Sequence, residues 1–277
     1  MEAPAAVLAV VLLEAAVGGL AVHWTAPTWG AVRHGYEVLL GATLGLLALV
    51  AWAAMRGPLD AVSGSLPASA AWTSRGLSAT TMAALASPVL ILLGAPVAGR
   101  VAGFVATLIG IASFVPLAQL RAGLGRGGGG LATGLFELLL GAFFLGAVVV
   151  GLVLGHWYLV ERRLSNRYML WMAWVNVAAV AAGLGSVMLS VRNPAPCVGL
   201  IGVELQNCLL TYSPLLSVGS VTVVMGIGLL AVVALIAVFN VRLAREGGRS
   251  IQASTGMFYL AVILAPAAEF AAKVRFF

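Results

Sequence analysis

Long runs of apolar residues, separated by short polar stretches, form the hydropathy pattern of this 277-residue chain. A helix needs about 20 mainly apolar residues to cross the hydrocarbon core of a bilayer. The pattern therefore predicts an all-α fold, a polytopic integral membrane bundle of about eight transmembrane helices in a single domain, residues 1–277. The expected spans are 4–23, 35–55, 78–95, 98–119, 131–158, 168–191, 214–240 and 252–272.

Glycine and proline decide where these spans are divided. The third and fourth runs form one apolar stretch, interrupted at Gly94–Arg100, where proline, arginine and glycines favour a tight reversal over a helix centre. We predict a hairpin at that point. The residues Gly57–Gly76 and the glycines of Gly123–Gly130 are interpreted as connectors. No short internal repeat is evident, and an arrangement of four plus four helices stays open.

The composition narrows the class of protein further. With 62% hydrophobic and 9% charged residues, the chain is not an ordinary water-soluble domain, and the lipid bilayer is its first expected partner. The net charge of +6 comes from arginines scattered over short loops, so no nucleic-acid partner is expected. Because no basic residue precedes Arg33, the first span lacks the start of a cleaved signal peptide and is expected to be retained.

Arginine clusters and a cysteine pair predict how the chain is threaded. Residues 161–167 and 242–249 carry arginines next to helix ends, where positive charge favours the cytoplasmic side. Cys197 and Cys208 share a loop on the other side, and a disulfide between them needs an oxidising compartment. We therefore predict a multi-pass protein of the bacterial cytoplasmic (inner) membrane with both termini extracytoplasmic. Two unpaired thiols are the alternative to the disulfide.

The histidines are the first candidates for chemistry. His23, His34 and His156 are the only three, and all are predicted at one edge of the membrane beside several tryptophans. Imidazole can ligate a haem iron or hydrogen-bond a quinone carbonyl near neutral pH. A six-coordinate haem b needs two facing imidazoles, for which His156 with His34 or His23 are the candidate iron ligands. An interfacial belt of polar aromatic side chains is the alternative interpretation.

A quinone site has simpler requirements, a donor to a carbonyl oxygen and an apolar slot lined by aromatic rings. Glu37 follows His34 by three residues, so the two side chains lie on neighbouring helix faces and could share a proton. A surface ion pair is the alternative role for Glu37. The candidates for the quinone-binding roles are His156, Trp157, Glu37, Arg162 and Arg163.

Carboxylates inside the predicted spans form a second set of candidates. Glu14 falls near the middle of the first span, and Glu137 lies early in the fifth. A charge at the bilayer centre costs about 2.5 kcal/mol or more, and such residues often serve ion pathways, so both are candidates for proton or cation handling. Glu269 precedes Lys273 by four residues, the favourable order for a structural intrahelical ion pair.

Several motifs are absent from the sequence. The chain contains no Walker A, HExxH, GxSxG or Cys-x-x-Cys sequence, and its short loops leave no room for a soluble catalytic domain. We therefore expect a subunit that is not catalytic by itself.

The helix number, the short loops and the ending Ala268–Phe277 (AEFAAKVRFF) resemble membrane anchor subunits of the DMSO reductase and polysulfide reductase (NrfD-like) type. The resemblance implies exchange of electrons between a quinol pool and a peripheral iron–sulfur subunit. The Gly-His-Trp-Tyr sequence at residues 155–158 departs from the family pattern, and no binding residue is carried over.

Three functional hypotheses follow. The first is a membrane subunit of a respiratory or other electron-transfer complex, which binds quinone, haem b or both near His23, His34 and His156 and anchors redox protein subunits. The second is a small secondary transporter that uses Glu14 or Glu137 for proton or cation coupling. The third is a structural or assembly subunit of a membrane complex.

Overall fold

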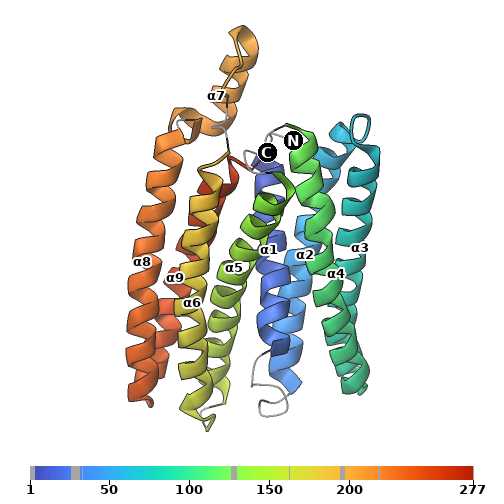
Figure 1. Cartoon of the computed structure of the whole chain (residues 1–277). Helices are drawn as coiled ribbons and strands as arrows, with labels where there is room; N and C mark the ends of the chain where they lie inside the picture. Colours follow the sequence, from blue (N-terminus) through green and yellow to red (C-terminus); the bar gives the residue numbers. More distant parts are fainter. Residues whose placement is uncertain are drawn as a thin grey trace.

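The described part of the chain consists of helices joined by short connections, with no strands (Figure 1). The computed structural model describes residues 4–25, 32, 34–125, 130–161, 163–193, 197–217 and 219–276, without the side chains of 213–217 and 219. The helices are α1 (Pro4–Thr25), α2 (His34–Val62), α3 (Pro67–Leu92), α4 (Pro96–Gly123), α5 (Gly130–Val160), α6 (Asn166–Ser190), α7 (Gly202–Ser217), α8 (Gly219–Glu246) and α9 (Ser250–Lys273).

Within the described ranges, eight helices are long and apolar enough to cross a membrane, which confirms the predicted all-α polytopic bundle. The shorter helix α7 is not one of them, and the sequence did not predict it. Because the number of spans is even, the two ends of the chain lie at the same end of the bundle, the end from which α7 projects (Figure 1). We refer to it as the α7 end.

The connector predicted over Gly57–Gly76 is wrong, because most of these residues are helical. α2 continues through Pro58 to Val62, and α3 already begins at Pro67. Proline is tolerated in the first turn of a helix, where its missing N–H would have had no partner. These terminal turns are too polar to register as part of an apolar span, although their backbone is helical.

The hairpin predicted at Gly94–Arg100 is confirmed. α3 ends at Leu92, α4 begins at Pro96, and Gly94 between them has a φ of 83°. Glycine adopts this left-handed conformation without a steric penalty. The tight turn makes α3 and α4 antiparallel neighbours, and it brings Arg100 into the first turns of α4.

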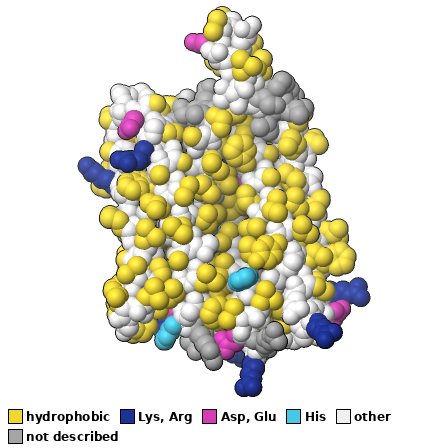
Figure 2. Space-filling view, turned by 180° about the vertical axis from the view of Figure 1, so that it is seen from behind, with side chains coloured by type: hydrophobic (Ala, Val, Ile, Leu, Met, Phe, Trp, Pro, Cys, Tyr) yellow, Lys and Arg dark blue, Asp and Glu magenta, His cyan; other side chains and the backbone are white. Residues whose placement is uncertain are grey.

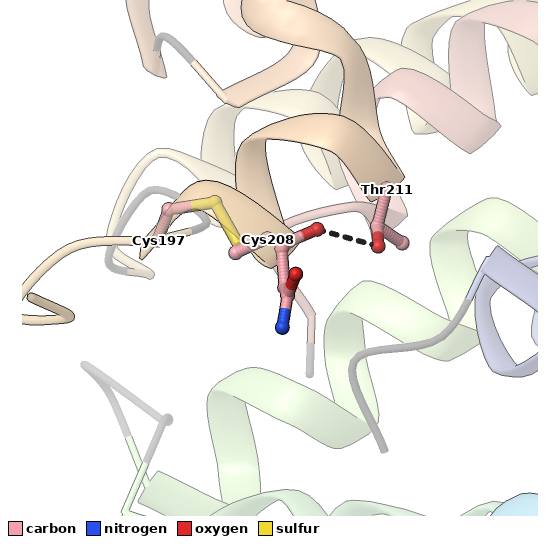
Figure 3. The surroundings of a disulfide bond; sticks show 4 residues. Cys197, Cys208 and Thr211 are labelled. Carbon is pink, nitrogen blue, oxygen red and sulfur yellow. Dashed lines mark hydrogen bonds between the residues drawn. A yellow bond between two sulfur atoms is a disulfide. The ribbon is translucent and has the colours of Figure 1, made fainter. Parts of the chain in front are cut away.

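A disulfide joins Cys197 to Cys208, as the sequence predicted (Figure 3). Cys208 belongs to α7, and Cys197 lies in the connection that precedes this helix. Thr211, further along α7, donates its hydroxyl hydrogen to the Asn207 carbonyl oxygen at 2.8 Å (Figure 3). The disulfide therefore ties α7 back onto the connection from α6.

α1 and α5 form the centre of the bundle, and their backbones touch. A Cβ added to Gly18 would lie 1.7 Å from the Ala142 carbonyl oxygen, and one added to Gly146 would lie 2.1 Å from the Gly18 carbonyl carbon. Only small residues let two membrane helices approach this closely. α1 and α5 are also the most enclosed spans, with 78% of the apolar window of each buried. Polar side chains on their facing surfaces are therefore held away from water and lipid.

The surface has the polarity expected of a bundle in lipid. Figure 2 shows apolar side chains across the middle of one face, with the charged side chains nearer its two ends. Exposed apolar side chains such as Leu46, Met82 and Leu108 lie in the spans themselves. This distribution matches a hydrocarbon band bounded by two polar interfaces.

Candidate functional site

Three glutamates and a lysine meet inside the bundle, and we call them the carboxylate–lysine network. Glu14 comes from α1, Glu137 from α5, and Glu269 and Lys273 from α9; each is 0% exposed. α1 packs on α5, and both helices contact α9, so positions that face one another on these helices converge. The two carboxylates predicted from the sequence for proton or cation handling are thus brought together at one lysine.

The Lys273 ammonium group lies at the centre of the network. Its Nζ atom is 2.7 Å from Glu269 Oε1, 3.1 Å from Glu14 Oε1 and 3.4 Å from Glu137 Oε1. The first of these contacts confirms the intrahelical pair predicted from the sequence. The Ser186 hydroxyl on α6 also donates to Glu269 Oε1, at 2.6 Å. By contrast, Glu14 has no donor among the described residues other than the Lys273 ammonium group.

Gly141 of α5 provides the space in which two of these carboxylates sit. A Cβ at this position would lie 2.5 Å from Glu269 Oε1 and 2.7 Å from Glu14 Oε1. Both distances are shorter than a carbon–oxygen contact allows. A residue larger than Gly141 would therefore displace both carboxylates, so the network needs glycine at this position.

Polar residues connect Glu137 with the α7 end of the bundle. Asn193, which follows α6, donates its side-chain N–H to Glu137 Oε2 at 3.2 Å. Arg121 of α4 donates to Asn193 Oδ1 and lies 3.9 Å from Glu137 Oε2. Arg275 donates to the Asn193 carbonyl oxygen at 2.6 Å, and it is half-buried. The polar contacts therefore continue from a fully buried carboxylate to a partly exposed guanidinium.

Arg275 carries positive charge at the edge of this polar chain. Partial burial lowers the pKa of its guanidinium, and the charge of Glu137 opposes that change. Guanidinium groups stay protonated at neutral pH even when their pKa is lowered. Arg275 is therefore a fixed cation between the network and the α7 end.

At the other end of α1, His23 lies in an aromatic–imidazole cluster with Trp24, Tyr36 and Trp157. His23 is 1% exposed, and its ring centre is 4.4 Å from that of Trp24 and 5.9 Å from that of Tyr36. The Tyr36 and Trp157 rings are 6.1 Å apart. Among the described residues, neither His23 nitrogen, nor the Tyr36 hydroxyl, nor the Trp157 indole N–H has a hydrogen-bond partner. Each buried polar group left unpaired costs about 1–3 kcal/mol, so this cluster has unused hydrogen-bonding capacity.

The other two histidines lie apart from this cluster. His34 is exposed at the start of α2, and His156 is exposed and within 3.3 Å of the Tyr259 hydroxyl on α9. Gly146 packs on Gly18 and Gly19. His156 lies ten residues beyond Gly146 and His23 four beyond Gly19, so His156 is farther from this contact along the bundle. The described side chains include no ring contact or hydrogen bond between two imidazoles.

The charged residues predicted beside the histidines have other surroundings. Glu37 is buried and forms a two-fold contact with Arg100 of α4, 2.9 Å to Nη2 and 3.2 Å to Nε, instead of facing His34. Arg163 is exposed, and Arg162 lies outside the described residues. Of the predicted quinone-binding side chains, Trp157 joins the cluster around His23, and Glu37 lies next to Tyr36 in the sequence.

Sequence reasoning missed Arg121, Asn193, Arg100 and Tyr36 as parts of these two sites. The arginines were assigned to loops because they follow or interrupt apolar runs, whereas both belong to α4. Asn193 lies in a connection, and no local pattern marks its partner. For Arg121 the sequence did contain a signal: residues Leu120–Gly123, which follow the apolar run, are compatible with one more helical turn.

Comparison of the chain with models of protein families, with curated proteins and with solved structures gives no match. The fold itself defines the class: the chain is a multi-pass α-helical membrane protein. Its candidate functional site is the set of three fully buried glutamates, Glu14, Glu137 and Glu269, that each contact the fully buried Lys273.

Proposed function

We propose that this protein takes up and moves protons through the carboxylate–lysine network, in the manner of a small secondary transporter that couples a solute to protons or cations. The observation that carries the proposal is the convergence of three fully buried carboxylates on one lysine between membrane-spanning helices. Ionisable side chains are rare and costly at such positions, and they typically belong to ion or proton pathways.

The network has the chemistry for proton exchange. Carboxylates that share one site titrate as a coupled set, because charge on one of them opposes charge on the others. Here the Oε1 atoms of Glu14, Glu137 and Glu269 all lie within 3.4 Å of Lys273 Nζ. A small displacement of the Lys273 ammonium group therefore changes which carboxylate has its negative charge neutralised by the lysine. It also changes which carboxylate binds a proton instead.

The surroundings of the network favour access from one side. Towards the α7 end, Asn193 and Arg275 continue the polar contacts of Glu137. Towards the other end, the backbone contacts of Gly18 with Ala142 and Gly146 close the space between α1 and α5. In this conformation we therefore infer that protons enter and leave from the α7 end.

The disulfide and the positions of the arginines indicate how the bundle is oriented in the membrane. We propose that the α7 end, with its disulfide and both chain termini, faces the extracytoplasmic side of a bacterial inner membrane. The disulfide and the arginines near the opposite helix ends support this orientation.

Proton entry into liposomes tests the proposed function. Purified protein is reconstituted into liposomes with a trapped pH-sensitive dye, and a potassium diffusion potential drives protons inwards. We expect faster acidification than in protein-free liposomes, and at least a tenfold slower rate for Glu137→Gln, which removes the carboxylate that joins the network to Asn193.

Glu246→Gln is the matched control for this measurement, because it neutralises an exposed glutamate of α8 that pairs only with Arg242 on its own helix among the described ion pairs. It is expected to acidify at the wild-type rate. A wild-type rate equal to that of empty liposomes contradicts the proposal.

The aromatic–imidazole cluster favours a second candidate function, a quinone-binding membrane subunit of an electron-transfer complex. Its support is the set of buried, unpartnered polar atoms on His23, Tyr36 and Trp157. These groups fit the requirements of a quinone, which needs hydrogen-bond donors to its carbonyl oxygens and aromatic walls around its ring. In that role the chain would anchor redox protein subunits, as the NrfD-like resemblance suggests.

Solvent extraction of the gently purified protein tests this candidate. We expect co-purified quinone in wild-type protein and a loss of most of it in Tyr36→Phe, which removes one unpartnered hydroxyl and keeps the ring. Tyr259→Phe is the matched control, because Tyr259 contacts His156 outside the cluster. Wild-type protein without quinone, or equal amounts in all three proteins, rules this function out at the cluster.

A further inference from the structure

The first four spans and the last four are arranged in the same way. In the first half α1 packs on α2, α2 on α3, α3 on α4 and α4 back on α1; in the second half α5, α6, α8 and α9 repeat this order. α1 and α5, the first helix of each half, pack on one another (Figure 1). Four spans return the chain to the side where it started, so the two halves have the same orientation, as in a parallel repeat.

Equivalent helices carry equivalent residues. Leu12–Gly18 of α1 and Leu135–Gly141 of α5 share the pattern Leu-x-Glu-x-x-x-Gly. In each case the glycine faces the other helix: Gly18 meets Ala142, and Gly141 meets Glu14. The fourth helix of each half carries a basic residue in its last turn, Arg121 in α4 and Lys273 in α9. These correspondences support an internal repeat of four spans, which the apolar pattern alone does not reveal.

Two ion pairs of the network join the halves crosswise, whereas Glu137 also lies 3.4 Å from Lys273 of its own half. Glu14 of α1 contacts Lys273 of α9, and Glu137 of α5 contacts Arg121 of α4. Each pair joins the first helix of one half to the fourth helix of the other. Exchange of the two halves would therefore turn one of these two pairs into the other.

Glu269 breaks this symmetry. It lies four residues before Lys273, whereas the residue four before Arg121 is the buried Leu117. Glu269 also makes the shortest contact with Lys273, at 2.7 Å, and accepts the Ser186 hydroxyl as well. Lys273 would be the partner of Glu14 in a symmetric arrangement. Its closest carboxylate is instead that of Glu269.

A count of the fully buried charges leaves one carboxylate in excess. Three glutamates, Glu14, Glu137 and Glu269, face two cations, Arg121 and Lys273, and all five are 0% exposed. Arg275 is outside this fully buried set: it is partly exposed, and its hydrogen bond goes to the Asn193 carbonyl oxygen. An uncompensated charge away from water is costly, and binding a proton removes that cost.

The hydrogen bonds indicate where this proton lies. Glu137 accepts from Asn193 and Lys273, and Glu269 accepts from Ser186 and Lys273. Hydrogen bonds of this kind stabilise the charged form of a carboxylate. Glu14 has only the Lys273 contact among the described residues, shared with both other glutamates, and no second donor.

We propose that the chain consists of two copies of a four-helix unit whose buried ion pairs were matched, and that the additional carboxylate of Glu269 leaves Glu14 as the residue that holds the exchangeable proton. This inference deepens the proposed function, on which it rests, by naming the proton-binding group. The charged groups that act on Glu14 are Glu137 from α5 and Glu269 and Lys273 from α9. α4 contributes Arg121, which pairs with Glu137, and the acidic residues of α2, Glu37 and Asp60, lie towards its two ends.

Infrared difference spectroscopy in H2O and D2O tests the inference without knowledge of the transported solute. Wild-type protein near neutral pH is expected to show a carbonyl stretch from a protonated carboxyl group in the bundle. The band should shift in Glu14→Asp, which keeps the carboxyl group and changes its position, and stay in place in Glu269→Asp. In Glu269→Gln the excess charge is gone, so the band should disappear although Glu14 is intact.

The outcomes separate this inference from the proposed function. A band that shifts in Glu269→Asp or Glu137→Asp and not in Glu14→Asp overturns the assignment to Glu14, while proton entry into liposomes still decides the proposed function. If wild-type protein shows no band from a protonated carboxyl group, the inference that one buried carboxylate binds a proton is wrong. This outcome is measured on wild-type protein and does not depend on whether a variant folds. Glu246→Gln, outside the network, should leave the spectrum unchanged and serves as the control.

Discussion

Replacement of Lys273 by methionine is expected to destabilise the protein more than any other single substitution in the bundle. Lys273 is the only lysine of the chain, it is fully buried, and it contacts three carboxylates. Removal of one partner of a buried ion pair costs about 3–5 kcal/mol, because the remaining charge stays uncompensated. Thermal unfolding in detergent, followed by tryptophan fluorescence, should show a large fall in Tm or a failure to accumulate folded protein.

A second substitution distinguishes charge imbalance from lost packing. In Lys273→Met, Glu269→Gln neutralises the nearest of the stranded carboxylates, so the double variant should recover part of the lost stability. Arg242→Met is the control, because it also replaces a cation by methionine, at an exposed position of α8. It should leave Tm nearly unchanged. A double variant less stable than Lys273→Met shows that charge is not the reason for the loss.

Gly18→Ala is expected to have the second largest effect, through the contact between the two halves. The added methyl group would lie 1.7 Å from the Ala142 carbonyl oxygen, so α1 and α5 have to move apart. Overpacking of this kind typically costs about 1–3 kcal/mol, and a backbone obstacle places the cost at the upper end. The displacement also separates Glu14 from the residues of α5, so proton entry should fall together with Tm.

Gly228→Ala provides a matched comparison for this substitution. Gly228 lies within α8, and a Cβ added there meets nothing within 4 Å. Alanine is a better helix former than glycine by about 1 kcal/mol, so stability should stay the same or rise slightly. If Gly18→Ala and Gly228→Ala unfold at the same temperature, the close approach of α1 and α5 does not limit stability.

The number of spans, the α3–α4 hairpin and the Cys197–Cys208 disulfide could be predicted because each depends on a local pattern of residues. Apolar runs are set by bilayer thickness, a reversal by proline and glycine, and the disulfide by the isolation of two cysteines in one loop. The pair Glu269–Lys273 was predictable for the same reason, since a spacing of four residues fixes neighbours on one helix.

The convergence of Glu14, Glu137 and Lys273 could not be predicted in this way. α1 and α5 are apolar around their whole circumference, so no amphipathic face shows which side of each helix points at the other. The same limitation affected the histidines: hydropathy placed His23 and His156 at one edge, whereas the register of α1 against α5 gives them different depths and different neighbours. Pairings between distant helices, such as Glu37 with Arg100, depend on rotations that a linear pattern does not contain.

The contact of Gly18 with Ala142 and Gly146 has a mechanical consequence for the bundle. Where two backbones touch, no layer of flexible side chains can yield, so the halves cannot slide past one another or be pressed closer at that level. The two halves can still tilt relative to one another about this contact. Glu14 lies one helical turn from Gly18, and a tilt of a few degrees would therefore move it little, while the far ends of α3 and α8 would swing through much larger distances.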